Sequence, residues 1–508
     1  MVEVESGSQG RKLRFVIIGA GMAGVLAGIK CKERGEEFTI YEKGDKVGGT
    51  WRENHYPGLA CDTPAHTYSY SFAHNPDWSS YFAPGPEIRE YFQAMADRYG
   101  VSEHIVFNAE IAECRWQEGR WHIRTKDGRS DVADVIVAAT GVLHHPKIAD
   151  IPGLNSFAGP YFHSARWDHS VEIDGKKIGV IGTGSTGVQI VSALCKRAGK
   201  LVHFQRSPQW IMPSTNPPYS EAQRAAFRAD PTLIDAERNA PEALARRARF
   251  TAAIIDKDSP ELAEIEAIVA KNLQDSVADP ALRAKLTPNY RAACKRMVFS
   301  GDYYRSVQES TVYIETGAID HVEPSGIRMK DGTFHELDVI ALATGFHADR
   351  FVRPMTVIGE NGEDLSDFWS ERPRAYFAVT VPHFPNFFLL NGPTGPVGNF
   401  SLTDIAERQW EYSDQLLNLV REGKAQAIAP SMEALLDYET RRKAAAMNTV
   451  FASGCSSWYL DSEGVPQVWP WSYPYFLDVM ANPRFEDYQL IGAADDDGDD
   501  EKKSSAAG

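Results

Sequence analysis

The stretch LRFVIIGAGMAGVLAGIKCKERGEEFTIYEK, residues 13–43, decides the fold of this chain. An apolar strand leads into the turn Gly19-Ala-Gly21-Met-Ala-Gly24, and a helix and a second apolar strand follow, which predicts a βαβ unit. Glycines at this spacing let the backbone turn tightly and approach a pyrophosphate, while the helix presents free N–H groups and its positive dipole end to the phosphates. Glu42 closes the second strand at the position where an acid hydrogen-bonds a ribose.

A second stretch, KKIGVIGTGSTGVQIVSALCKRAGKLVHFQRS at residues 176–207, repeats the order of strand, glycine-rich turn, helix and strand. Its turn is GTGSTG, residues 182–187, but its second strand is followed by Arg206 instead of ending in an acid. An arginine at this place can pair with a 2′-phosphate that a carboxylate would repel. The second unit therefore predicts a preference for NADPH over NADH, the alternative being that Arg206 is an ordinary surface charge.

The first unit has an acid, Glu42, after its second strand, and the second unit has Arg206 there. This difference in charge favours FAD in the first unit and NADPH in the second. We expect an α/β fold with two Rossmann-like dinucleotide-binding domains and a helical insertion, which the composition and proline breaks of residues 220–292 predict. Two strands that end in Ala-Thr-Gly, at Gly141 and Gly345, mark expected crossings between the domains. The expected divisions are 1–147 and 336–493 for the FAD-binding domain, 148–219 and 294–335 for the NADPH-binding domain, 220–293 for the helical insertion, and 494–508 for a disordered acidic tail.

The bulk composition excludes several classes of protein. With 508 residues, 43% hydrophobic and 24% charged, the chain has the profile of a soluble protein of several domains, without a signal peptide or an apolar run that could cross a membrane. A net charge of −16 makes nucleic acids and anionic membranes poor partners. The six cysteines form no CxxC pair, so we expect a reducing cytoplasm, with neither disulfides nor a metal site. A monomer or a small homo-oligomer is expected.

Two further stretches carry a resemblance to a known family. Residues 48–62 are GGTWRENHYPGLACD, and residues 157–168 are FAGPYFHSARWD. They resemble the two fingerprints of type I Baeyer–Villiger monooxygenases, which are class B flavoprotein monooxygenases, and the resemblance runs from about residue 13 to about residue 475. The matching residues are Gly49, Trp51, Tyr56, Pro57, Gly58 and Asp62 in the first fingerprint, and Phe157, Gly159, His163, Trp167 and Asp168 in the second.

The resemblance implies an activity and a set of cofactor-binding residues. NADPH would reduce FAD, O2 would form a C4a-peroxyflavin, and attack on a ketone would give an ester or lactone while NADP⁺ stays bound. The cofactor-binding residues that we expect are Gly19, Gly21, Gly24, Glu42, Gly49, Thr50, Trp51, Asp62, Gly182, Gly184, Ser185, Thr186, Gly187, Arg206, Lys295 and Trp458.

The segment Cys294-Lys295-Arg296-Met297 matches the Lys-Arg pair that this family places after the helical insertion. Such chemistry needs a peroxide kept anionic, and a fixed, permanently charged guanidinium provides this, so Arg296 is the candidate catalytic residue. The resemblance implies that Asp62 holds Arg296 and that Lys295 joins Arg206 at the 2′-phosphate. The alternative for Arg296 is a surface or domain-interface ion pair.

Three other assignments remain open between a functional and a structural role. For His163 and Trp167, the resemblance implies a conformational role that couples domain movement to catalysis, which we favour over acid–base work by His163. Trp458 resembles the tryptophan that hydrogen-bonds the nicotinamide cofactor, the alternative being a core tryptophan. The aromatic segment 67–82 either lines the substrate pocket or packs the core.

Competing functions share some of these features. Flavin-containing monooxygenases that oxidise nitrogen or sulfur use the same cofactors, but they lack the Trp-Asp ending of the second fingerprint. A flavin or disulfide reductase needs a redox-active cysteine pair, and we expect none in this chain. A non-catalytic redox sensor is disfavoured because both glycine-rich turns, Arg296 and Asp62 are present together. The sequence leaves linear, cyclic, aryl and steroid ketones open as substrates.

Overall fold

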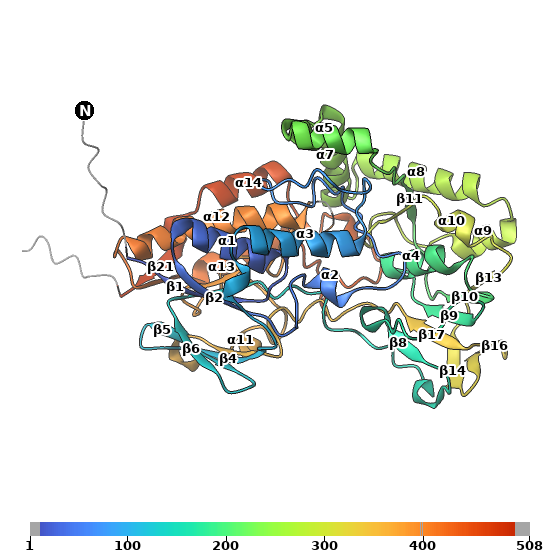
Figure 1. The fold of residues 1–508 in the computed structure, drawn as a ribbon, viewed down its shortest axis with the longest axis horizontal. Coiled ribbons are helices and arrows are strands. Elements are labelled where there is room, and N and C mark those ends of the chain that lie inside the picture. Colours follow the sequence, from blue (N-terminus) through green and yellow to red (C-terminus); the bar gives the residue numbers. More distant parts are fainter. Residues whose placement is uncertain (1–10, 397, 399, 493–508) are drawn as a thin grey trace, which may run out of the picture.

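Two five-stranded parallel sheets form the centres of the two halves of the molecule, on the left and right of Figure 1. A computed structural model describes residues 11–396, 398 and 400–492. The predicted acidic tail lies outside the described residues. The α/β fold with two Rossmann-like units is confirmed, because each sheet begins with a strand, a glycine-rich turn and a helix.

The first sheet is built around the strand that precedes Gly19. In spatial order its strands are β19 (Phe387–Leu389), β7 (Val135–Ala138), β1 (Arg14–Ile18), β2 (Glu37–Tyr41) and β3 (Ile105–Val106). The last four residues of β1 are buried, as expected for a central strand of a parallel sheet that is covered on both faces. Strand β19 comes from the part of the chain that follows Gly345, so segments far apart in sequence share this sheet.

The second sheet has the same construction. In spatial order its strands are β13 (Val312–Glu315), β10 (Lys200–Phe204), β9 (Lys177–Ile181), β17 (Val339–Leu342) and β8 (Tyr161–His163). Strands β8 and β17 pair in parallel, with His163 opposite Leu342. Strand β8, which lies within the second fingerprint, and the strand that leads to Gly345 therefore end side by side.

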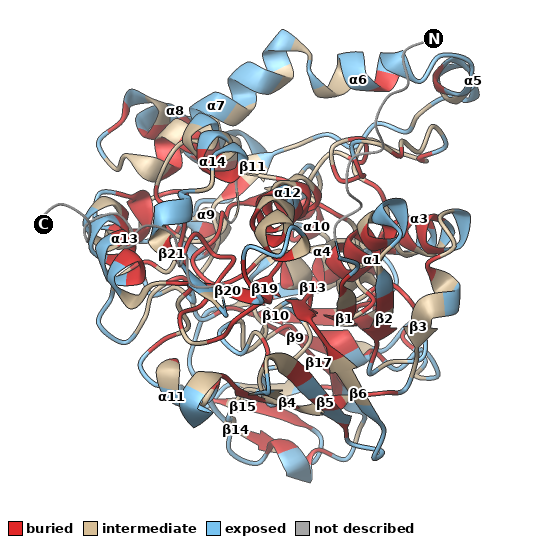
Figure 2. Cartoon of the chain, turned by 90° about the vertical axis from the view of Figure 1, so that its left-hand side faces the viewer, coloured by how far each residue is buried: buried red, intermediate tan, exposed pale blue. Residues whose placement is uncertain are grey.

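Residues 220–292 are largely helical. Their helices are α5 (Glu221–Ala229), α6 (Thr232–Arg238), α7 (Pro241–Ile255), α8 (Pro260–Ser276) and α9 (Pro280–Leu286). The proline breaks of the sequence stand at helix starts, where the missing N–H of proline costs no hydrogen bond. Helices α6 and α7 lie along the upper edge of the molecule and are largely exposed (Figure 2).

The smaller sheets and remaining helices complete the two halves. An antiparallel hairpin around Gly128 is formed by β5 (Arg120–Thr125) and β6 (Ser130–Ala133). The other strands are β4 (Ile111–Gln117), β11 (Ile211–Pro213), β12 (Val298–Ser300), β14 (Ile319–Glu323), β15 (Gly326–Met329), β16 (Phe334–Glu336), β18 (Thr356–Ile358), β20 (Ala427–Pro430) and β21 (Tyr488–Ile491). The other α-helices are α1 (Met22–Arg34), α2 (Thr50–Glu53), α3 (Gly85–Arg98), α4 (Ser185–Leu194), α10 (Tyr303–Ser306), α11 (Leu365–Phe368), α12 (Leu402–Arg421), α13 (Met432–Ala446) and α14 (Tyr473–Ala481).

The aromatic segment 67–82 contributes to the core around the first sheet. Tyr68, Tyr70 and Trp78 are buried there among the side chains of α1 and α3. For these three residues the structure favours core packing over a substrate-lining role. Among the described residues, none of the helices has both the length and the apolar character that crossing a membrane requires.

The expectation that the cysteines form no disulfide was wrong. Cys294 and Cys455 are joined by a disulfide although 161 residues separate them in the chain. The other four cysteines are free and buried. Spacing rules detect cysteine pairs that are close in sequence, so a pair brought together only by packing of distant segments escapes them.

Candidate active site and nucleotide sites

The first glycine-rich turn lies directly against the start of the first fingerprint. A Cβ atom added to Gly21 would lie 3.3 Å from the Cα atom of Gly49, so the two backbones are in contact. Helix α1 follows Gly21, and no side chain caps its N-terminus. Thr50 begins α2 next to this point. The N–H groups in the first turn of α1, which no side chain caps, fit the phosphates of a dinucleotide.

Glu42 is held beside this turn at the end of β2. The side chain is buried, and its carboxylate accepts hydrogen bonds from the backbone N–H groups of Ala20 and Gly44, at 2.8 and 2.7 Å. Arg52 lies 3.5 Å from the same carboxylate. The acid therefore has a fixed orientation next to the first glycine-rich turn, at the position that the sequence predicted.

The first fingerprint connects the two halves of the molecule. The hydroxyl group of Tyr56 donates to Oε1 of Gln189 on α4 at 2.8 Å, and Nε2 of Gln189 donates to the carbonyl oxygen of Ala60 at 3.0 Å. Thr186, in the second glycine-rich turn, donates to the Tyr56 hydroxyl at 3.4 Å. Burial raises the pKa of Tyr56 to about 12. Residues 56–60 thus rest on the helix that follows the second turn.

Two other residues of this fingerprint make local contacts. Nε1 of Trp51 donates to the hydroxyl group of Tyr68 at 3.2 Å. Gly58 has a φ angle of 82°, and a Cβ atom there would lie 2.8 Å from the carbonyl oxygen of Gln189. A larger residue at position 58 would separate the fingerprint from α4.

Arg296 and Asp62 form an ion pair, as expected. Nη2 of Arg296 donates to both carboxylate oxygens of Asp62, each at 2.8 Å, across 234 residues of sequence. About a third of the arginine side chain, 37%, is accessible, so the guanidinium is anchored but not enclosed. The Asp62 carboxylate raises the pKa of Arg296, and the group is a permanent cation. The pair uses one nitrogen of the guanidinium, and its other N–H groups remain for further partners, Tyr459 among them.

Sequence reasoning missed Tyr459, which lies beside Arg296. Its side chain is buried, and apart from an interaction with Arg296 its hydroxyl group has no hydrogen-bond partner in the described part of the chain. A Cβ atom added to Gly398 would lie 3.5 Å from this hydroxyl and 3.7 Å from Nη1 of Arg296, so both groups face one point. Burial raises the pKa of Tyr459, with a smaller opposite effect from Arg296, so the phenol keeps its proton. The residue stands outside both fingerprints, and its only signal was its place after Trp458.

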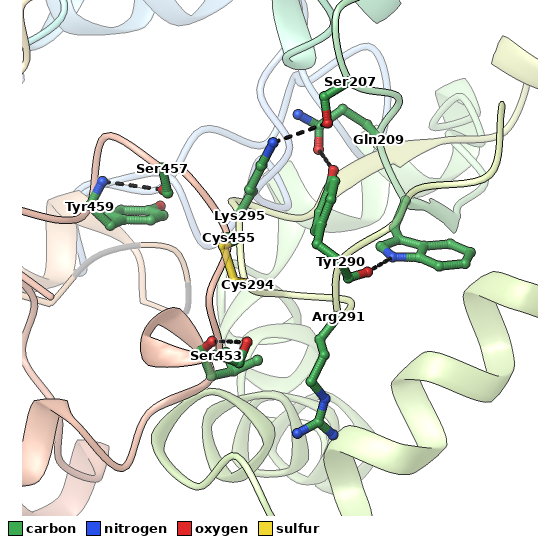
Figure 3. Close-up of a disulfide and its surroundings, with 12 residues drawn as sticks. Ser207, Gln209, Tyr290, Arg291, Cys294, Lys295, Ser453, Cys455, Ser457 and Tyr459 are labelled. Atoms are coloured by element: carbon green, nitrogen blue, oxygen red, sulfur yellow. Dashed lines mark hydrogen bonds between the residues drawn. A yellow bond between two sulfur atoms is a disulfide. The ribbon is translucent and has the colours of Figure 1, made fainter. Parts of the chain in front are cut away.

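Arg206 and Lys295 line one pocket of 390 Å³. Nζ of Lys295 lies 3.2 Å from Oγ of Ser207 and 4.3 Å from the ring centre of Tyr290 (Figure 3). Burial and the positive charge of Arg206 lower the pKa of Lys295. The lining residues are Arg206, Ser207, Asn289, Tyr290, Lys295, Gly454, Cys455 and Ser456. Two cations without an acid among these lining residues form a site for an anion.

Trp458 lies on the surface of the loop that follows Cys455. Its relative exposure is 53%, so the alternative of a core tryptophan was wrong. The ring centre lies 4.1 Å from that of Tyr459. The indole is therefore available to a ligand, close to the Arg296 ion pair.

His163 uses both ring nitrogens to connect the second sheet with the crossing at Gly345. Nδ1 accepts from the backbone N–H of Ala165 at 3.1 Å, which leaves the proton on Nε2, and Nε2 donates to the carbonyl oxygen of Gly345 at 2.9 Å. The side chain is buried, and burial lowers the pKa of His163. With both nitrogens engaged and the ring neutral, the geometry disfavours an acid–base role.

The remaining residues of the second fingerprint shape the edge of this sheet. Phe157 and Trp167 are buried in two hydrophobic clusters. Gly159 lies against the backbone of Asp338, whose carbonyl oxygen would be 2.3 Å from an added Cβ atom. Asp168 accepts from the backbone N–H and the hydroxyl group of Ser170, at 2.9 and 2.6 Å. These contacts are structural.

Comparisons with known proteins all find monooxygenases. The family model described as flavin-binding monooxygenase-like matches residues 12–220. A Baeyer–Villiger monooxygenase of Streptomyces coelicolor is 37% identical over 488 residues, which cover 95% of this chain and 93% of that protein. An uncharacterized monooxygenase of Mycobacterium tuberculosis is 44% identical over 486 residues, which cover 95% and 97%.

Solved structures agree over nearly the whole chain. Cyclohexanone monooxygenase from Rhodococcus sp. Phi1, bound to NADP⁺, superposes with a TM-score of 0.84 at 28% identity and covers 95% of this chain and 100% of its own. An oxidized steroid monooxygenase bound to NADP has a TM-score of 0.85 at 27% identity, with the same coverage.

Proposed function

Because the chain belongs to the type I Baeyer–Villiger monooxygenases of the flavin-binding monooxygenase-like family, we propose that it oxidises ketones at the Arg296–Asp62 ion pair. The enzyme depends on FAD and NADPH and inserts one oxygen atom of O2 next to a ketone carbonyl. Bound FAD, reduced by NADPH, supplies the activated oxygen. The protein supplies binding, orientation and electrostatic stabilisation around it.

The observation that carries this proposal is the double hydrogen bond from Nη2 of Arg296 to Asp62. The carboxylate holds the Nη2 end of the guanidinium in place, and neither of these hydrogen bonds uses its other N–H groups. A permanent cation held in this way stabilises negative charge on the reacting oxygen atoms and needs no reorganisation during the reaction. The test is NADPH oxidation in air with and without a ketone panel, with products followed by gas chromatography. We expect ester in proportion to NADPH consumed, whereas hydrogen peroxide as the sole product would contradict the proposal.

The two glycine-rich turns hold the cofactors in this assignment. The uncapped start of α1 takes the pyrophosphate of FAD, with Glu42 at its ribose. The start of α4, which also lacks a side-chain cap, takes the pyrophosphate of NADPH. The pocket with Arg206 and Lys295 then receives the 2′-phosphate.

Replacing Arg206 with alanine is expected to raise the KM for NADPH about tenfold or more and to leave NADH kinetics unchanged. A charge-assisted contact to the phosphate contributes about 1.5–3 kcal/mol, and 1.4 kcal/mol is a factor of ten in affinity. Steady-state kinetics with both cofactors make the comparison. Arg197→Ala is the control, because Arg197 pairs with Asp174 on the surface of the same half. An equal loss with NADPH and NADH would show that Arg206 does not contact the phosphate.

Tyr459 is proposed as a hydrogen-bond donor at the same site. A guanidinium has only donors, so the phenol oxygen can accept from Arg296 while the phenol proton needs an oxygen acceptor. The described residues supply none, and a ligand oxygen next to Arg296 completes the arrangement.

Replacing Tyr459 with phenylalanine is expected to lower the rate of ester formation about tenfold, as one neutral hydrogen bond of about 1–1.5 kcal/mol is lost. FAD content and the rate of flavin reduction should not change, because the ring still packs on Phe451. The ratio of ester to hydrogen peroxide is the decisive measurement. Tyr438→Phe is the control, since Tyr438 is also a buried phenol, and its hydroxyl group interacts with Thr394 and not with Arg296. Equal effects of the two substitutions would mean that Tyr459 has a packing role alone.

A further inference from the structure

The disulfide between Cys294 and Cys455 lies in the wall of the pocket that contains Arg206 and Lys295. We propose that this cystine is a reversible redox site that sets the affinity of the enzyme for the 2′-phosphate of NADPH. The inference rests on the proposed function of the pocket as the 2′-phosphate site. A thiol–disulfide exchange at this place would change the preference for NADPH over NADH.

The bond joins two walls that come from distant parts of the chain. Cys294 directly precedes Lys295 and Arg296, whereas Cys455 stands between Gly454 and Ser456 in the segment after α13. Figure 3 shows the two sulfur atoms between these segments. Lys295 extends from the segment that contains Cys294 toward Ser207. The cystine therefore closes one side of the pocket.

Besides the disulfide, the second wall is held by packing of Cys455 in a buried cluster with Met297 and Val450. In the described part of the chain, Gly454, Cys455 and Ser456 make no hydrogen bond, through backbone or side chain, to any other residue. The same loop is anchored further along, where Nη1 of Arg372 lies 3.1 Å from Asp461 and Nη1 of Arg442 donates to the carbonyl oxygen of Pro466 at 2.8 Å. The disulfide is thus the covalent link between the wall and the segment that carries Lys295.

Reduction would release the wall and open the pocket to water. The contacts of Arg206 and Lys295 with a phosphate would then be more solvated, and closing the loop again would cost conformational entropy at each binding event. Both effects weaken binding of a 2′-phosphate. NADH has no such group, so its binding should not depend on the redox state.

A dithiol can reduce this disulfide, and hydrogen peroxide can form it again. Cys455 lines the pocket and is 5% exposed, whereas Cys294 is fully buried, so a thiolate entering through the pocket attacks the sulfur of Cys455. The sulfur of Cys294 leaves and takes a proton, and the second thiol of the reductant releases Cys455. In the reverse direction, one thiolate attacks a peroxide oxygen to form a sulfenic acid and water. The other thiol then displaces a second water and restores the disulfide.

The first measurement is a count of free thiols in the FAD-loaded enzyme, made after denaturation with an alkylating reagent and mass spectrometry. We expect four alkylated cysteines of six when the protein is purified in air, and six after treatment with dithiothreitol. Peroxide should restore the value of four. Six alkylated cysteines after peroxide treatment would overturn the proposal.

The second measurement is the Kd of adenosine 2′,5′-bisphosphate for the FAD-loaded enzyme, by calorimetry in both redox states. Reduction should weaken binding on the order of tenfold, while 5′-AMP binding stays the same. By linkage, saturating bisphosphate should lower the midpoint potential of the cystine by about 30 mV for a tenfold difference, and it should slow reduction. The double variant C294S/C455S should bind weakly in both states, and Cys195→Ser should retain the wild-type response. If the double variant does not fold, the titration of the wild-type protein is sufficient.

Two results distinguish failure of this inference from failure of the pocket assignment. If bisphosphate binds equally in both redox states and Arg206→Ala weakens it, the cystine is only structural and the inference is wrong. If Arg206→Ala leaves bisphosphate binding unchanged, the pocket does not hold the 2′-phosphate and both are wrong.

Discussion

Replacing Arg296 with alanine is expected to lower ester formation by about 10²–10³-fold or more, while FAD stays bound and NADPH still reduces it, at least in part. The guanidinium is proposed to stabilise negative charge that exists only after O2 has reacted, so earlier steps should depend on it less. Stopped-flow absorbance during flavin reduction and during reaction of the reduced enzyme with O2, combined with product analysis, separates these steps.

Two further variants make this test specific. Arg296→Lys should not restore activity, because a single ammonium group on a flexible stem cannot reproduce a planar guanidinium held by Asp62. Arg291→Ala serves as the matched control, since Arg291 lies five positions upstream and pairs with Glu266 instead. Ester formation by Arg296→Ala at a rate near that of the wild type would show that the ion pair with Asp62 is structural only.

Replacing Gly184 with alanine is expected to lower the rate of flavin reduction by NADPH on the order of 100-fold without lowering the stability of the protein. Gly184 has an ordinary φ angle of −67°, and a Cβ atom there would meet no protein atom within 4 Å. The methyl group would enter the space where the pyrophosphate of NADPH is proposed to approach the start of α4. A loss of about 2.7 kcal/mol in binding free energy corresponds to the 100-fold change. FAD content, thermal stability and chemical reduction by dithionite should equal those of the wild type.

Gly187 provides a contrast within the same turn. A Cβ atom at this position would lie 2.0 Å from the carbonyl oxygen of Gly182, so Gly187→Ala should lower the thermal stability of the NADPH-binding half. Gly184→Ala is therefore expected to affect the reaction with NADPH, whereas Gly187→Ala is expected to affect thermal stability. If Gly184→Ala left the KM for NADPH and the reduction rate unchanged, the cofactor would not lie over this turn.

The fold and the cofactor classes could be predicted from the sequence because their signals are local. A strand, a glycine-rich turn and a helix occupy about thirty consecutive residues, and the periodicity of apolar residues within them is visible without knowledge of partners. The proline breaks of residues 220–292 mark helix starts for the same reason. The pairing of Arg296 with Asp62 was expected from resemblance to a family, and the structure brings the two residues together across 234 positions.

The features that were missed all depend on contacts between distant segments. The bond between Cys294 and Cys455, and the phenol of Tyr459 beside Arg296, have no counterpart in spacing or composition. The two engaged nitrogens of His163 likewise become visible only when Gly345 is placed opposite them.

By itself the sequence determined that the chain forms two dinucleotide-binding units, because strands, turns and helices are specified by neighbouring residues. Only the tertiary structure decided which wall closes the pocket around Lys295 and which group faces Arg296. That wall and that group, Cys455 and Tyr459, both come from the segment after α13. The placement of that segment follows from packing of the two halves and from anchors such as Arg372 and Arg442, whose partners are set by the complete fold.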